Sequence, residues 1–193
     1  MPHSLTDEQW RTFVDKGYIR LGKIVTDEEL NGLRQRIDEI MMGTAVVPYD
    51  RMMLQLDSTT GEYGDMPAQT KGHKGATLAY RKMQQLEFDP LFLSYMQKAL
   101  FKDICIRAYG LDIPIFIFRA MFMNKPAEQG TELPWHQDIG KGWGLDQNPT
   151  ITVWTALDDA TVENGCMQIV PGSNRLGILN EGHYTSEEDQ AKY

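Results

Sequence analysis

Apolar residues change their spacing part-way along this chain, from a helical repeat to the two-residue alternation of strands. In the first half they recur every three or four residues, which indicates helices that bury one face. In the second half they alternate with other residues, which indicates strands that bury one face of an antiparallel sheet. At 193 residues the chain suits one domain. We therefore predict a single α+β domain over 1–193, helical over about 1–104 and strand-rich over about 105–175.

Three helices are predicted in the first half, and local signals mark where each begins. Residues 6–9 and 26–29 are capping boxes, in which the first and fourth side chains satisfy each other's backbone N–H groups. Gly17 ends the first helix, and a short strand is expected over 18–21. Asp89 supplies an N-cap, and the proline after it fits the first helical position. The side chains expected to pack into the core are Trp10, Phe13, Val14, Leu30, Leu33, Ile37, Ile40, Leu91, Phe92, Tyr95, Met96, Ala99 and Leu100.

Two segments of the second half alternate clearly enough to predict strands. Over 113–123, one face holds isoleucine, arginine and methionine side chains, and the other holds phenylalanine and alanine. The run 150–157 alternates in the same way. Asn164 and Gly165 form a tight-turn signal between two further strand-like runs. Hairpins of this kind favour an antiparallel barrel or sandwich, and periodicity alone does not choose between the two.

The segment from Asp57 to Ala76 differs from its surroundings, because it holds several glycines and few large apolar residues. This composition predicts a mobile loop. Two interpretations stay open, a disordered connector and a lid or substrate loop over a nearby site. His73 lies in this segment without a partner at ligand spacing, so we do not assign it to a metal site.

The composition excludes several classes of partner. A net charge of −8 argues against a nucleic-acid backbone or an anionic membrane surface. No apolar run reaches membrane-spanning length, because Arg119 interrupts the best candidate, and the acidic N-terminus has no signal-peptide core. Cys105 and Cys166 predict neither a disulfide framework nor a metal cluster. We interpret them as reduced thiols of a cytoplasmic protein.

His136 and Asp138 are the candidate metal ligands of the chain. Side chains two residues apart on an extended segment point to the same face, so both can reach one metal ion. Imidazole and carboxylate suit Fe(II) in a site of two histidines and one carboxylate, which leaves other coordination positions open. The structural alternative is a histidine beside a turn aspartate, because the bare motif is short.

The segments around this motif, taken in order, resemble the phytanoyl-CoA dioxygenase family of Fe(II)- and 2-oxoglutarate-dependent oxygenases. The resemblance is strongest over about 80–174, and it is carried by the run that ends at Met123, by 133–138, by 149–157 and by 163–173. It implies a double-stranded β-helix, the jelly-roll architecture of cupins, with the N-terminal helices packed outside. It also implies that Fe(II), 2-oxoglutarate and O₂ are used to hydroxylate a small organic substrate, with release of succinate and CO₂.

The resemblance also assigns residues to the cosubstrate pocket. Lys82 matches a lysine close to 2-oxoglutarate, and its ammonium group can pair with a carboxylate. Met121 and Trp154 match residues that line the same pocket. A solvated lysine and two core residues are the structural alternatives. Asp138 favours hydroxylation, because oxygenase-like halogenases lack this carboxylate.

Members of the family carry a later iron-binding histidine and then an arginine that binds 2-oxoglutarate, and the sequence offers no match for either. His183 is the one histidine after Asp138, and it lies in polar, turn-like sequence that does not favour metal binding. We therefore expect an incomplete barrel here, with the C-terminal strands and both residues beyond 193. Two alternatives remain, a non-catalytic fragment or degenerate relative that binds a ligand or partner, and a cupin-like enzyme with another metal. A small molecule is the expected ligand, and the oligomeric state is left open.

Overall fold

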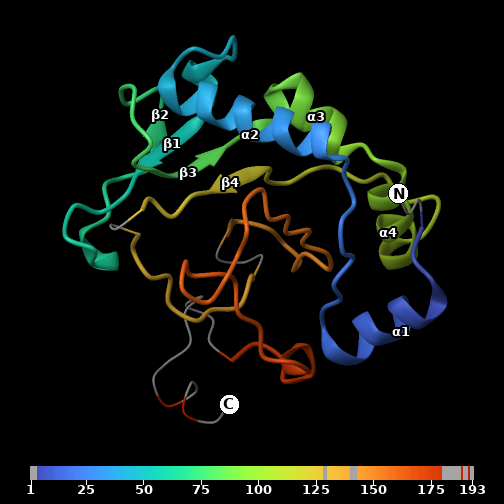
Figure 1. Cartoon of the computed structure of the whole chain (residues 1–193). Helices are drawn as coiled ribbons and strands as arrows, with labels where there is room; N and C mark the ends of the chain where they lie inside the picture. The colour runs from blue at the N-terminus through green and yellow to red at the C-terminus, as the bar shows by residue number, and fades with distance from the viewer. Residues whose placement is uncertain (1–3, 128–129, 140–142, 180–187, 189–190, 192–193) are drawn as a thin grey trace.

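In the computed structural model, which describes residues 4–127, 130–139, 143–179, 188 and 191, a four-stranded antiparallel sheet of order β2-β1-β3-β4 organises the chain (Figure 1). The strands are β1 (Met53–Leu56), β2 (Thr70–Lys71), β3 (Tyr80–Gln84) and β4 (Met121–Met123). The α-helices are α1 (Asp7–Lys16), α2 (Asp27–Met42), α3 (Pro90–Met96) and α4 (Ala99–Tyr109). Short 3-10 helices are η1 (Tyr49–Arg51), η2 (Tyr63–Asp65), η3 (Leu86–Phe88) and η5 (Ser173–Arg175).

Both predicted capping boxes are confirmed. The Thr6 hydroxyl accepts from the Gln9 backbone N–H at 3.1 Å, and the Gln9 side chain accepts from the Thr6 N–H at 2.9 Å. The same reciprocal pair opens α2 at Thr26. Gly17 ends α1 in the left-handed region, at a φ of 79°, as predicted. The strand expected over 18–21 is wrong, because these residues form no strand.

The third predicted helix begins where expected but is divided in two. The Asp89 carboxylate accepts from the backbone N–H groups of Leu91 and Phe92 at 2.9 and 3.1 Å, which caps α3. Helix α3 then ends at Met96, and the expectation that it continues to Leu100 is wrong. Lys98 adopts extended backbone angles, φ −57° and ψ 143°, which interrupt the helical hydrogen bonds before α4 begins.

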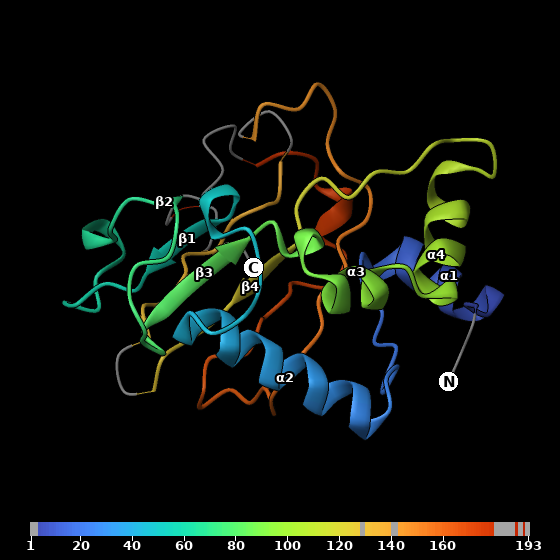
Figure 2. The same ribbon diagram turned by 90° about the horizontal axis from the view of Figure 1, so that it is seen from above.

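Helices α2 and α3 cover one side of the sheet (Figures 1 and 2). Paired residues of neighbouring strands share a face, and Leu54, Met83 and Phe122 lie opposite one another across β1, β3 and β4. This face packs against the α2 side chains that the helical spacing assigned to the core. The buried members of the cluster include Leu33, Ile37, Ile40, Leu54 and Met83.

The opposite face of the sheet carries more polar side chains. Gln55, Lys82 and Met123 lie opposite one another in the register, and Gln84 lies opposite Met121 on the same face. In Figure 1 the chain that follows β4, coloured orange, runs along the side of the sheet away from α2. Lys82 and Met121, two residues that sequence analysis assigned to a cosubstrate pocket, therefore share the face that is turned toward the chain after β4.

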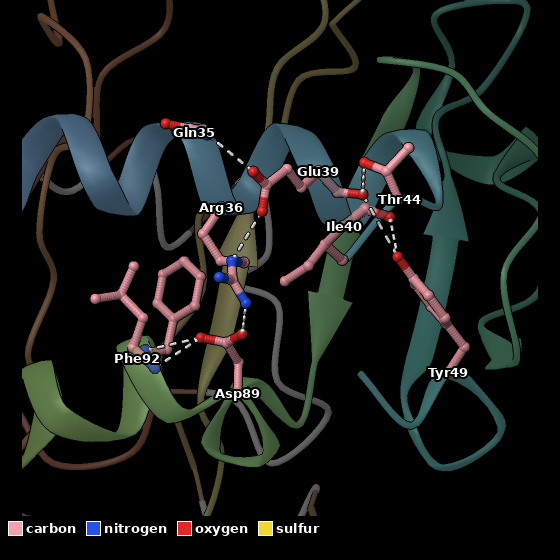
Figure 3. A network of polar contacts seen from close by, with 9 residues as sticks. Gln35, Arg36, Glu39, Ile40, Thr44, Tyr49, Asp89 and Phe92 are labelled. Atoms are coloured by element: carbon pink, nitrogen blue, oxygen red, sulfur yellow. Dashed lines mark hydrogen bonds and ion pairs between the residues drawn. The ribbon is translucent and has the colours of Figure 1, made fainter. Parts of the chain in front are cut away.

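A buried carboxylate joins the two helices that cover the sheet. The Asp89 side chain is fully buried, and its second oxygen accepts from Arg36 Nη1 of α2 at 2.9 Å. Arg36 also pairs with Glu39 through Nε at 3.0 Å. Figure 3 shows Arg36 between the Glu39 carboxylate on its own helix and Asp89 at the start of α3. One carboxylate thus caps α3 and fixes it to α2.

The predicted strands of the second half are largely absent. Of 113–123, only Met121–Met123 forms a strand, and Ile113 and Phe116 upstream are 53% and 85% exposed. Residues 150–157 form no strand. The turn at Gly165 is confirmed, with the Cys166 N–H donating to the Thr161 carbonyl at 2.8 Å. Alternation shows that a segment can become a strand, but a strand also needs a paired neighbour, and sequence spacing does not supply one.

The interpretation of the glycine-rich segment 57–76 as a disordered connector is wrong, because η2 and β2 lie within it. His73 of this segment is a structural residue. Its Nδ1 accepts from the Gly75 N–H at 3.3 Å, so Nε2 carries the proton and donates to the Met41 carbonyl at 2.9 Å. The ring also contacts Tyr49 edge-on, at 5.1 Å between centroids. Both cysteines are free thiols, and among the described helices none is long and apolar enough to cross a membrane.

Candidate metal and cosubstrate site

His136 is held in an orientation suited to metal binding. It forms an isolated β-bridge, and its Nδ1 lies 2.8 Å from the Pro134 carbonyl oxygen. A carbonyl only accepts, so Nδ1 carries a proton, and in the neutral ring the lone pair is on Nε2. Histidines that bind metals are commonly oriented in this way, by a hydrogen bond from the other ring nitrogen to a backbone carbonyl. Nε2 faces Asp138, with 3.7 Å between Nε2 and Oδ1.

The spacing of these two atoms is close to that of neighbouring metal ligands. Ligand atoms about 2.1 Å from one ion and at right angles to each other are roughly 3 Å apart. The observed 3.7 Å exceeds this by less than 1 Å, and the Asp138 side chain is 41% exposed and can rotate. The pair therefore fits two ligands of Fe(II). Among the described residues no cluster of three His, Cys, Asp or Glu side chains could hold a metal, and His183 lies outside those residues.

A buried contact fixes the chain just before His136. Asp57, at the end of β1, accepts from the Thr131 hydroxyl at 2.6 Å and from the Thr131 N–H at 3.4 Å. Both side chains are almost fully buried, and the Asp57 N–H donates to the Ala79 carbonyl at 2.8 Å. Sequence reasoning missed this pair, because its members are far apart in the chain and only the position of Asp57 after a strand could have indicated it. The sheet therefore positions the ligand-bearing segment.

Lys82 lies on the sheet face that is turned toward this segment, and the structure brings it near Asp138. Partial burial lowers the pKa of Lys82, and the positive charges of Arg81 and Arg119 lower it further. The Asp138 carboxylate opposes these effects and raises the pKa. Met121 shares the face with Lys82 and is 36% exposed, which leaves its side chain accessible to a ligand.

Trp154 and Gln137 lie in different surroundings. Trp154 is 50% exposed, and the neighbouring Thr155 hydroxyl bonds to that of Tyr95 on α3. Gln137 donates to the Gly177 carbonyl at 2.8 Å and accepts from the Leu179 N–H at 2.7 Å. Gln137 thus holds a later segment beside the candidate ligands.

Comparison with known proteins identifies the family of the chain. The family model described as "Phytanoyl-CoA dioxygenase (PhyH)" matches residues 13–192. The chain belongs to the phytanoyl-CoA dioxygenase family. No solved structure gives a significant match. The family relationship supports an oxygenase at a coarse level, and its members generally depend on Fe(II) and 2-oxoglutarate.

Three relatives illustrate the range of this family. A phytanoyl-CoA dioxygenase domain-containing protein 1 from Danio rerio is 28% identical over 203 residues, covering 90% of this chain and 67% of the relative. A probable phytanoyl-CoA dioxygenase from Caenorhabditis elegans is 27% identical, covering 95% of this chain and 57% of its own length. An L-proline trans-4-hydroxylase from Streptomyces griseoviridis is 32% identical over 72 residues, which is 35% of this chain and 26% of that enzyme. The chain thus spans roughly two thirds or less of these dioxygenase relatives.

Proposed function

We propose that this protein is an Fe(II)- and 2-oxoglutarate-dependent dioxygenase that hydroxylates a small organic molecule and releases succinate and CO₂. The observation that carries the proposal is the orientation of His136. Its Nδ1–H donates to Pro134, which points Nε2, the lone-pair nitrogen of the neutral ring, toward the Asp138 carboxylate 3.7 Å away. An imidazole and a carboxylate so placed are two of the three protein ligands that non-haem Fe(II) oxygenases use.

In this proposal, one set of residues binds the metal and another binds the cosubstrate. His136 and Asp138 hold the iron, and Lys82, Met121 and Trp154 contact 2-oxoglutarate. Iron held by His136 and Asp138 would supply the redox chemistry that couples oxidation of the 2-oxo acid by O₂ to hydroxylation of the substrate. The protein positions its ligands through the Asp57–Thr131 contact and keeps the His136 ring proton on Nδ1. We also propose that the complete domain is a double-stranded β-helix, in which the observed sheet forms part of one layer.

A metal-dependent spectroscopic band tests this assignment. Under anaerobic conditions, Fe(II) and 2-oxoglutarate together should give the natively expressed protein a visible charge-transfer band, which shows chelation of the cosubstrate by bound iron. His136→Ala and Asp138→Ala should each lose the band and the 2-oxoglutarate-dependent formation of succinate. Asp112→Ala, which removes an exposed carboxylate in the turn after α4, is the matched control and should keep both.

The results also separate the remaining alternatives. If the wild-type protein binds neither Fe(II) nor 2-oxoglutarate, the protein is instead a non-catalytic fragment or degenerate relative. If it binds a divalent metal through His136 and Asp138 without any response to 2-oxoglutarate, the site belongs to a cupin-like enzyme of another kind. Retention of succinate formation in either alanine variant would remove these residues from the iron site.

A further inference from the structure

Arg119 lies beside a stacked pair of aromatic rings, one from the chain before β4 and one from the chain after the candidate ligands. Its guanidinium carbon lies 5.1 Å from the centre of the Phe118 ring and 5.0 Å from that of Trp143. The two rings are stacked, 6.0 Å apart between centroids and 25° between planes. Trp143 follows Asp138 closely in the chain, so this contact joins the segment of the metal ligands to the chain entering β4. Contacts of this kind hold an arginine in place without using its N–H donors.

Arg119 lies beside Trp143 and just before β4, and this strand pairs with the strand of Lys82. Ala120 and Phe122 belong to the cluster that packs under α2, and Met121 between them faces the other way. Arg119, just before Ala120, lies close enough to Lys82 for its charge to lower the pKa of that lysine. Met121 lies opposite Gln84, and Lys82 is two residues from Gln84 on that strand face. Met121 and Lys82 thus share one face of the sheet, and Arg119 lies close to Lys82. Arg119 is only partly exposed, as is Lys82.

The positive charges of Lys82 and Arg119 are not balanced. Among the residues that the structure describes, neither Lys82 nor Arg119 has a carboxylate within ion-pair distance. Asp138 is the carboxylate close enough to affect Lys82, and iron binding would use it. Two like charges in partly buried positions oppose folding unless an anion compensates them. Arg175 and Arg107, by contrast, pair with aspartates of their own.

We propose that Lys82 and Arg119 together bind a carboxylate group of a small-molecule ligand at this site. A planar guanidinium presents paired N–H donors that match the two oxygens of a carboxylate, and the lysine adds a second positive charge. The inference rests on the proposed function and adds Arg119, which the family resemblance did not assign. The carboxylate belongs either to 2-oxoglutarate or to the substrate, and the shared chemistry is the same.

Binding measurements on Arg119→Gln in the natively expressed protein test the proposal. The variant keeps a polar side chain but removes the charge. Arg51→Gln is the matched control, because Arg51 also stacks on an aromatic ring, with its guanidinium carbon 4.1 Å from the centre of Phe88, but it lies on η1. The probes are 2-oxoglutarate and 2-oxovalerate, which lacks the distal carboxylate, each titrated anaerobically with Fe(II). L-proline and L-prolinamide, titrated in the presence of 2-oxoglutarate, probe a substrate carboxylate.

If the carboxylate is that of 2-oxoglutarate, Arg119→Gln should weaken the binding of 2-oxoglutarate roughly 10- to 100-fold, as expected for a lost charge-assisted contact. Binding of 2-oxovalerate should not change. If the carboxylate is that of the substrate, 2-oxoglutarate binding should not change, and wild-type preference for L-proline over its amide should vanish in the variant. Arg119→Lys should recover part of either loss.

Unchanged binding of all the probes relative to Arg51→Gln would overturn the role of Arg119. That result differs from failure of the proposed function. In the latter case the wild-type protein itself would give no charge-transfer band with Fe(II) and 2-oxoglutarate.

Discussion

Thr131→Val should destabilise the protein by about 2 kcal/mol, because it removes a buried hydrogen bond to a carboxylate. The Thr131 hydroxyl lies 2.6 Å from Asp57 Oδ1, and the two residues are 3% and 7% exposed. Valine keeps the shape of threonine and removes only the donor. Hydrogen bonds to charged groups contribute roughly 1.5–3 kcal/mol, and a buried carboxylate that loses a donor cannot recover it from water.

The size of the effect should depend on the charge of Asp57. Asp57 Oδ1 also accepts from the Ser58 N–H at 2.8 Å, so this oxygen retains one donor after the substitution. In an Asp57→Asn background the hydroxyl meets a neutral acceptor, and Thr131→Val should then cost only about 1 kcal/mol. The difference between the two backgrounds measures the charge-assisted part of the contact.

Urea unfolding of wild type, Thr131→Val, Asp57→Asn and the double variant gives their free energies of unfolding. The four values can be compared when the slope of free energy against urea concentration is the same in each protein. Thr59→Val is the control, because Thr59 is an exposed threonine in the loop that follows Asp57. The free energy of unfolding of this variant should stay within about 0.5 kcal/mol of the wild-type value. Equal costs of Thr131→Val and Thr59→Val would refute the reasoning. So would an equal cost of Thr131→Val in both backgrounds.

Two further substitutions test the helices. Asp89→Ala should destabilise the protein by about 3 kcal/mol in urea unfolding, because it removes the α3 cap and leaves Arg36 without its buried partner, whereas the exposed Asp38→Ala should be nearly neutral. Glu29→Gln should cost about 0.5 kcal/mol at neutral pH. The hydrogen bonds from Lys98 and Thr26 lower the pKa of Glu29 below its ordinary 4.5. The loss of stability in Glu29→Gln should therefore be full above pH 4.5 and disappear as the pH falls through the lowered pKa. A loss of stability that persists in acid would contradict this.

The helices could be predicted because their signals are local. A capping box at Thr6 and a glycine at position 17 act within one turn of the residues that they order, and both behave as the sequence indicates. The sheet could not be predicted to the same degree, because strands are defined by partners. Strand β3 pairs with β4 across a long stretch of chain, and neither β1 nor β3 has a spacing that distinguishes it from a loop.

The candidate site shows the same division. His136 and Asp138 could be found from their spacing, since two alternate residues on extended chain share a face. Arg119 carried a signal of this kind, because it alternates with Met121, but its importance depends on the aromatic ring of Trp143 and on the nearby charge of Lys82. Such neighbours become visible only when the chain is folded. Site residues that act through distant contacts therefore stay hidden in a single sequence.

Strand β3 presents Lys82 to the candidate site and the next residue, Met83, to the core under α2. A deletion or insertion of one residue inside Tyr80–Gln84 would exchange these two faces, placing an ammonium group in the apolar layer and a thioether beside Asp138. Replacement of Lys82 changes one contact, whereas a change of length inverts the strand. Descendants of this sequence can therefore diversify β3 by amino-acid replacement, while variation in length is confined to the connections before and after it.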